Sequence, residues 1–409
     1  MDIEHNSRKK FYRFPFGAVT CGGEVRLRLA VSGAGIPSAV RLVYMEDGKG
    51  EVRKDMPYIF DVGDHCIYSV NVKMPEKAGL VWYYFELETE RGMVYYGNNS
   101  KQLGGIGEMC FNSPSNSYQI TVYNEDYKTP DWFKTGIAYQ IFVDRFCNGN
   151  ENGEFLGNRT DIIKRNWGEQ PFYKAEQFGG EYKANDFFGG NLKGVIKKLP
   201  YLKDLGISVI YLNPIFKAYS NHKYDTGDYE TIDPMFGDEE TFKELCSKAK
   251  EMGIRIILDG VFNHTGSNSR YFNKYGEYDS VGAYQSKESP YYTWFRFMDW
   301  PDVYESWWGM TTLPQIEEHS EECRKYLLSD KDAIVKRWIK NGASGWRLDV
   351  VDELPGFFVK ELRENVKKAD KDAVIIGEVW EDASNKSAYG ERREYFLGKE
   401  LDSVMNYPM

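Results

Sequence analysis

Apolar and polar residues alternate in short runs along the first part of the chain. Between about residues 11 and 125, an apolar residue occurs at every second position within such runs, as at 25–29. This alternation is typical of strands with one buried face. The strongest run is Val81–Leu87, and glycine, asparagine and proline residues separate the runs. We therefore predict an antiparallel β sandwich over residues 1–125, followed by a linker at 126–134.

After this linker, short apolar runs alternate with segments of helical periodicity. One helix is predicted between Asp238, a suitable N-cap, and Gly253, and a second between Ala333 and Gly342. Such repeats build either a doubly wound sheet or an eight-stranded barrel, and no glycine-rich phosphate loop of the nucleotide-binding type follows any of the strands. The runs predicted as buried parallel strands are Ile137–Phe142, Ile207–Leu212, Ile254–Leu258, Gly345–Val350, Val374–Gly377 and Ser403–Met405.

Two long segments, 147–185 and 265–314, interrupt these repeats. Both follow the C-terminal ends of predicted strands, the face that carries the active site in α/β folds. The second is rich in aromatic residues, which indicates a small subdomain with its own core, stacking platforms beside a sugar cleft, or both. These aromatic residues are Tyr291, Tyr292, Trp294, Phe295, Phe297, Trp300, Tyr304, Trp307 and Trp308.

The composition narrows the class of protein. The chain has 409 residues, room for two or three domains, and its 42% hydrophobic and 28% charged residues are ordinary for a folded protein. The formal charge of −10 argues against nucleic acid as a partner. The six cysteines form no Cys-x-x-Cys pair, and the sequence shows neither a secretory signal nor a membrane-length apolar run. We expect free thiols, no membrane partner and a cytoplasmic location.

Ionisable residues cluster at the ends of three predicted strands, and Asp259 and His264 follow one of these strands. Because the carboxyl ends of parallel strands meet at one face, Asp349 and Glu378 should lie across one ligand, and such carboxylate pairs cleave glycosidic bonds. Arg347 should hold the pKa of Asp349 low, as a nucleophile requires, and apolar neighbours should raise the pKa of Glu378, as a general acid requires. Alternatively, Arg347 and Asp349 form only a structural ion pair, and Glu378 is a solvent-exposed carboxylate.

Five segments carry a resemblance to a known family. Four of them closely resemble, in order, the signature regions of the α-amylase family of glycoside hydrolases. Together with the fifth, they look most like the neopullulanase and cyclomaltodextrinase branch. The resemblance covers residues 135–409 and implies a (β/α)8 TIM-type barrel, incomplete in this chain with strands 1 to 6 only, and a loop subdomain inserted around 265–314. The sandwich is similar in type to the immunoglobulin-like or starch-binding domain of that branch. The signature segments are 221–226, 259–264, 345–349 and 377–380, and the fifth segment is 186–194.

The resemblance implies a retaining hydrolase, with no required cofactor, that cleaves α-1,4 or α-1,6 glucosidic bonds in maltooligosaccharides, cyclodextrins or pullulan. Asp349 would be its nucleophile and Glu378 its acid/base. Asp225 would pair with a cation, and His222 would either contact the sugar or only pack the loop. A transglycosylase and a non-catalytic glucan-binding fragment are the alternatives, and relatives often form homodimers through the N-terminal domain. The residues implied to bind the sugar are Tyr224, Asp225, Asp259, His264, Arg347 and Trp380.

Three features depart from the family pattern. Glu381 follows Trp380 where the branch usually has a histidine. A loop similar to the calcium site of some relatives has asparagine at two positions where aspartate is common, which removes charge that calcium prefers. The family's third carboxylate, which follows the seventh strand, is not in this chain, so we expect residues 1–409 alone to hydrolyse glucans weakly or not at all. The candidate calcium ligands are Asn148, Asn150, Glu154 and Asn191.

Overall fold

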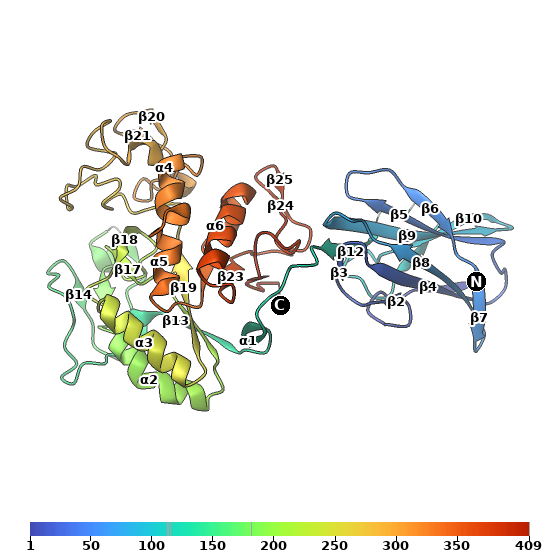
Figure 1. Ribbon diagram of the computed structural model, residues 1–409, viewed down its shortest axis with the longest axis horizontal. Coiled ribbons are helices and arrows are strands. Elements are labelled where there is room, and N and C mark those ends of the chain that lie inside the picture. The colour runs from blue at the N-terminus through green and yellow to red at the C-terminus, as the bar shows by residue number, and fades with distance from the viewer. Residues whose placement is uncertain (113, 115, 181, 409) are drawn as a thin grey trace. The chain divides into compact units, whose positions relative to one another are not determined.

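The structure is a computed structural model that divides into two compact units (Figure 1). The first comprises Met1–Lys128 together with Glu394–Lys399, and the second comprises Thr129–Arg393 together with Glu400–Met409. The boundary lies inside the predicted linker, and the predicted limits miss the short segment after Arg393 that groups with the first unit. The residues that the structure describes are 1–112, 114, 116–180 and 182–408.

The first unit consists of two mainly antiparallel sheets. The alternating runs of its sequence bury one face, so that Val25, Leu27 and Leu29 belong to one apolar cluster with Tyr83 and Phe85. One sheet has the order β1-β4-β8-β7 with β2 beside β4, and its strands are β1 (Asp2–Glu4), β2 (Arg13–Phe14), β4 (Glu24–Ser32), β7 (Tyr58–Val62) and β8 (His65–Lys73). The other contains β3 (Val19–Thr20), β5 (Ala39–Glu46), β6 (Val52–Asp55), β9 (Gly79–Thr89), β10 (Gly92–Gly97), β11 (Glu108–Cys110) and β12 (Tyr118–Tyr123).

The second unit is built on a six-stranded parallel sheet. A strand lies within or overlaps each of the six apolar runs that the sequence marks. The inner strands β16, β19, β22 and β23 are buried along nearly their whole length, whereas the edge strands β13 and β26 are partly exposed. Parallel pairing in chain order places the carboxyl ends of all six strands on one face, as in the part of a (β/α) barrel that they would form. The strands, in sheet order, are β13 (Ala138–Ile141), β16 (Val209–Leu212), β19 (Arg255–Gly260), β22 (Gly345–Leu348), β23 (Val374–Gly377) and β26 (Ser403–Val404).

Helices connect several of these strands (Figure 1). As predicted, one of them starts after Asp238, whose carboxylate accepts a hydrogen bond from the Thr241 amide at 2.8 Å, and it buries Phe242, Leu245 and Ala249. α2 packs beside α3, and α5 packs beside α6. The helices are α1 (Asp131–Lys134), α2 (Leu192–Asp204), α3 (Glu239–Glu251), α4 (Glu321–Arg324), α5 (Ile334–Lys340) and α6 (Gly356–Ala369).

The inserted segments contain short hairpins and single helical turns. In the second, Phe272 and Tyr304 are buried with ring centres 4.7 Å apart, so this segment has an aromatic core of its own. Trp307 from the same segment instead lines a cavity, and a role of its ring as a stacking platform for a sugar stays a prediction. The short strands of the second unit are β14 (Ile163–Lys164), β15 (Asp186–Phe187), β17 (Phe216–Ala218), β18 (Thr226–Ile232), β20 (Phe297–Asp299), β21 (Val303–Tyr304), β24 (Ser387–Ala388) and β25 (Glu391–Arg392).

The thiol prediction is confirmed, because all six cysteines are free in the structure. No helix among the described residues combines the length and the apolar character needed to cross a bilayer. The cytoplasmic location stays a prediction.

Candidate active site

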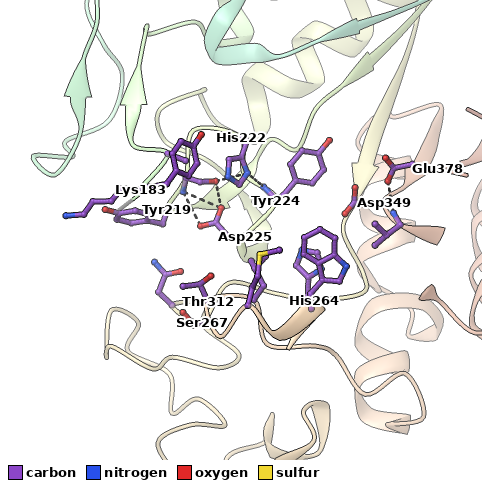
Figure 2. Close-up of a pocket in the computed structure, with 18 of the residues that line it drawn as sticks. Lys183, Tyr219, His222, Tyr224, Asp225, His264, Ser267, Thr312, Asp349 and Glu378 are labelled. Carbon is purple, nitrogen blue, oxygen red and sulfur yellow. Dashed lines mark hydrogen bonds between the residues drawn. The ribbon is translucent and has the colours of Figure 1, made fainter. Parts of the chain in front are cut away.

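A cavity of about 880 Å³ opens at the carboxyl ends of the parallel strands. Three of its lining side chains come from two adjacent strand ends: Arg347 and Asp349 at the end of β22, and Glu378 directly after β23. Figure 2 shows Asp349 and Glu378 next to one another at one end of this cavity. The structure thus brings together the two carboxylates that the sequence predicted to share one ligand.

The Arg347 guanidinium holds the two carboxylates together. Its Nη1 atom lies 2.7 Å from Asp349 Oδ1, and its Nη2 atom lies 2.9 Å from Glu378 Oε2. Nη1 also donates to Asp259 Oδ1 at 2.8 Å. Because these side chains are buried or nearly so, one cation balances three carboxyl groups in a region of weak solvent screening.

Four donors surround the carboxylate of Glu378. Besides Arg347, the Val350 amide donates to Oε2 at 2.9 Å, and the Trp380 indole and the Tyr407 hydroxyl donate to Oε1 at 3.1 and 3.3 Å. Val350 has a φ of 38°, in the left-handed region that a β-branched residue rarely adopts. This strained turn directly after Asp349 aims the amide at Glu378 and links the positions of the two carboxylates.

The pKa directions are the reverse of those predicted from the sequence. Burial raises the pKa of Asp349 to about 8, the Asp259 charge adds to this effect, and Arg347 opposes it. Burial also acts to raise the pKa of Glu378, but the Arg347 charge and the hydrogen bonds from Val350, Trp380 and Tyr407 outweigh it and lower that pKa. The prediction was wrong because it gave Arg347 to Asp349 alone.

Asp259 lies beneath the cavity rather than in its wall. Its carboxylate accepts hydrogen bonds from the Tyr211 and Tyr224 hydroxyls and from Arg347, and its side chain is fully buried. Tyr224 itself lines the cavity, and its hydroxyl also accepts a hydrogen bond from Asn213 at 3.2 Å. Asp259, predicted among the sugar-binding residues as a support of their subsite, accepts hydrogen bonds from Tyr224 and Arg347 and so orients both. It is not among the residues that line the cavity.

Asp225 and His222 line the cavity farther from Asp349 and Glu378 (Figure 2). Asp225 was predicted to pair with a cation, but among the described residues its hydrogen bonds come from the Ser220 amide and hydroxyl. His222 Nδ1 lies 3.1 Å from the Ser220 hydroxyl and accepts a hydrogen bond from the Tyr224 amide. His222 therefore packs the loop and also lines the cavity, and its contact with a sugar stays a prediction.

His264 stands next to Asp349 in the cavity wall (Figure 2). Its ring stacks on Trp307 with centres 5.1 Å apart, and burial lowers its pKa to about 4, so the imidazole is neutral at pH 7. Among the described residues its Nε2 atom is buried without a hydrogen-bond partner. A sugar hydroxyl is a suitable partner for this nitrogen.

Several lining residues were not predicted. Gln140 lines the cavity and donates a hydrogen bond to Asn213 at 2.9 Å. Asn213, which is not among the lining residues, follows directly after β16, and this strand-end position was a usable signal. Tyr407 lies beside Glu378 although 29 residues separate them in the chain, and nothing local in the sequence marks it. Trp380, which was predicted, lines the cavity and is 49% exposed.

The negative charge of Glu381 is balanced in the structure. Its carboxylate and that of Asp352 both pair with Lys386. This cation, five residues farther along the chain, compensates for the departure from the family pattern.

The candidate calcium ligands form a loop that is closed by its own hydrogen bonds. Asn191 Oδ1 caps α2 by accepting from the Gly194 amide at 2.9 Å, and Asn148 Oδ1 accepts from the Asn150 amide at 2.8 Å. The amide nitrogens of Asn148 and Asn150 both donate to the Glu154 backbone oxygen. The side-chain oxygens of Asn148 and Asn191 thus already accept hydrogen bonds from the protein, which disfavours calcium at this loop, and calcium binding stays a prediction.

The comparisons with known proteins agree with this geometry. A family model described as the catalytic domain of alpha amylase matches residues 140–409. The chain belongs to the alpha-amylase family. The match contains the whole carboxylate cluster around Arg347 and extends over most of the second unit.

Relatives of this alpha-amylase family member act on α-glucans, according to their names. An amylopullulanase from Thermoanaerobacterium saccharolyticum is 39% identical over 99% of this chain and 33% of its own length. A cyclomaltodextrinase from Thermoanaerobacter pseudethanolicus is 40% identical over 68% of this chain and 44% of its own length. The solved structure of the type III pullulan hydrolase from Thermococcus kodakarensis is 29% identical, with a TM-score of 0.60 over 99% of this chain and 65% of that chain. The chain thus spans less than half the length of these two curated relatives.

Proposed function

We propose that the complete gene product containing residues 1–409 hydrolyses glucosidic bonds in α-glucan oligosaccharides with retention of configuration. One observation carries the proposal: Asp349 and Glu378 bind neighbouring nitrogens of one guanidinium in the wall of one cavity. Sharing one guanidinium favours the short carboxyl separation of about 5–5.5 Å that retaining glycosidases use. The names of the relatives support α-glucans as the substrate class.

In the proposed reaction Asp349 attacks the anomeric carbon while Glu378 gives its proton to the leaving glycosidic oxygen. The C–O bond breaks, and the sugar remains attached to Asp349 as an ester. Glu378, now ionised, then takes a proton from a water molecule, whose oxygen attacks the same carbon and releases Asp349. Arg347 pairs with both carboxylates, so its guanidinium keeps one anionic partner when the other carboxylate loses its charge.

The cavity walls supply the sugar contacts. Tyr224 and Trp307 present aromatic rings, which suit the C–H faces of a glucosyl unit. The neutral imidazole of His264 offers its Nε2 atom, and His222 lies next along the wall. These groups lie on one side of Asp349, and Glu378 and Trp380 lie on the other.

The proposal predicts that Asp349→Asn in the complete gene product lowers kcat for maltooligosaccharides by at least about 10⁴-fold, because the nucleophile is lost. Reducing-sugar release measures the rate, and circular dichroism checks the fold. Asp332→Asn is the matched control, because that side chain is 80% exposed and lies on another part of the unit. Retained turnover in Asp349→Asn, or a first product with inverted anomeric configuration by NMR, would contradict the mechanism.

A further inference from the structure

The turn that follows Asp349 is fixed by residues that lie outside the cavity. Val350 has a left-handed φ of 38°, and the single helical turn Val351–Glu353 continues from it. A β-branched residue keeps such a conformation only where the surrounding structure fixes it. The residues that fix this turn therefore also fix the Val350 amide, which donates to Glu378 Oε2 at 2.9 Å.

Arg393 is one of the residues that hold this turn. Its side chain is only 2% exposed. Its Nη1 atom donates to the Leu354 carbonyl at 2.9 Å, and its Nη2 atom donates to the Asp352 carbonyl. Carbonyl groups at the end of a helical turn lack partners within the turn, so this two-point contact caps it. The planar guanidinium fixes the relative position of the two carbonyl groups.

The segment between β23 and Arg393 holds the same region at two further points. Lys386 pairs with the Asp352 carboxylate, and Glu391 accepts a hydrogen bond at 3.1 Å from the amide of Gly356, the first residue of α6. Glu391 also pairs with Arg393 at 3.1 Å. A side chain at Gly356 would displace the Glu391 carboxylate, because its Cβ atom would lie 2.6 Å from Oε1. The segment thus clamps the turn from its end and from the start of the next helix.

The position of Asp349 depends less on this clamp. Its backbone amide donates to the Gly260 carbonyl at 3.1 Å, which continues the pairing of β22 with β19. Its carboxylate pairs with Arg347. Loosening the turn should therefore affect the Val350 amide, and with it Glu378, more than Asp349.

We infer that Arg393 is a positioning residue for Glu378 and acts through the turn at Val350. The inference rests on the proposed function, in which Glu378 gives its proton to the leaving oxygen. Arg393 is not among the residues that line the cavity, so it acts through the backbone of the turn and not on the substrate. The segment after β23 carries Glu378 at its start and fixes, from its end, an amide that contacts this carboxylate.

The test compares two substrates that differ in their need for an acid. A sugar leaving group must be protonated as its bond breaks, whereas fluoride leaves without a proton. In the complete gene product, Arg393→Gln should lower kcat/KM for maltotetraose about tenfold, and should leave kcat/KM for α-maltosyl fluoride within about twofold. This ratio of constants reports the steps up to bond cleavage, so the later use of Glu378 as a base does not enter.

Two further variants complete the test. Lys371→Gln removes one positive charge from the exposed loop between α6 and β23 and is the control, which should alter neither value. Glu391→Ala loosens the same clamp at a side chain that is 47% exposed. It should lower kcat/KM for maltotetraose relative to the fluoride by at least about threefold, and it decides the test if circular dichroism shows that Arg393→Gln does not fold.

The outcomes separate this inference from the proposed function. A selective loss for maltotetraose supports the positioning role, because a general structural defect would affect both substrates. Equal losses for both substrates, or no loss in the folded variants, would overturn the role of Arg393 and leave the hydrolase intact. If the unaltered gene product cleaved neither substrate, the proposed function would fail as well.

Discussion

Replacing Arg347 by leucine should destabilise the second unit in a pH-dependent way. The guanidinium is 4% exposed and contacts three carboxyl groups, Asp259, Asp349 and Glu378. Removing one partner of a buried ionic cluster costs about 3–5 kcal/mol, because the remaining charges lose their compensation. We expect the free energy of unfolding at pH 8 to fall by that amount.

The loss in the free energy of unfolding caused by Arg347→Leu should be smaller at pH 5. Without the guanidinium, burial raises the pKa values of the carboxyl groups above those in the unfolded chain. Between the unfolded and the folded pKa values, the folded variant binds more protons than the unfolded one. Its stability therefore decreases as pH rises through this range. Acidification protonates the cluster and removes the repulsion. The difference between Arg347→Leu and the wild type should therefore narrow between pH 8 and pH 5.

Urea denaturation followed by tryptophan fluorescence measures this loss. Of the 10 tryptophans only Trp82 lies in the first unit, so the signal reports mainly on the second. Arg296→Leu is the control, because Arg296 is 56% exposed and its pairs with Glu305 and Glu317 should contribute under about 1 kcal/mol. A loss below about 1 kcal/mol for Arg347→Leu, or an equal loss at both pH values, would refute the reasoning.

Two further predictions concern buried rings. His5 is fully buried, bonds to the Arg28 carbonyl and the Tyr83 hydroxyl, and has its pKa lowered by burial to about 3, so unfolding takes up a proton below pH 6.5. As pH falls from 6.5 to 3, the free energy of unfolding of the first unit should decrease by up to about 1.4 kcal/mol per pH unit. His5→Gln should make this dependence on pH less steep in circular dichroism melts, and an unchanged slope would contradict the prediction. Trp307→Ala should lower kcat/KM for maltooligosaccharides by up to about tenfold through loss of the stack on His264, and an unchanged value would argue against a sugar-facing role.

The positions of the parallel strands could be predicted because each is a continuous apolar run. Strand ends then located Arg347, Asp349 and Glu378, since all parallel strands present their carboxyl ends at one face. Tyr407 could not be found in this way. It lies 29 residues from Glu378 in the chain, and no local periodicity records the packing that brings the two together.

The ionic environment of the site was the part that the sequence could not predict. Arg347 lies two residues from Asp349, which suggested an ion pair between these two residues alone. In the folded chain, Asp259 and Glu378 also contact the same guanidinium. The donors that lower the pKa of Glu378 include an amide made available by the strained turn at Val350. Such effects depend on three-dimensional distances of about 3 Å, which residue spacing does not specify.

The shared guanidinium also suits the proposed reaction, in which two carboxyl groups of one site serve as acid and as nucleophile. Asp349 and Glu378 compete with Asp259 for one positive charge, so near neutral pH the cluster should keep a proton on one carboxyl group. Before a sugar binds, Asp349 holds it more strongly, because burial and Asp259 raise its pKa. The proposed bond cleavage requires the proton on Glu378 instead. A sugar that displaces the Trp380 and Tyr407 donors from Glu378 Oε1 would raise the pKa of Glu378 and draw the proton there. Substrate binding would thereby set the protonation state that the reaction needs.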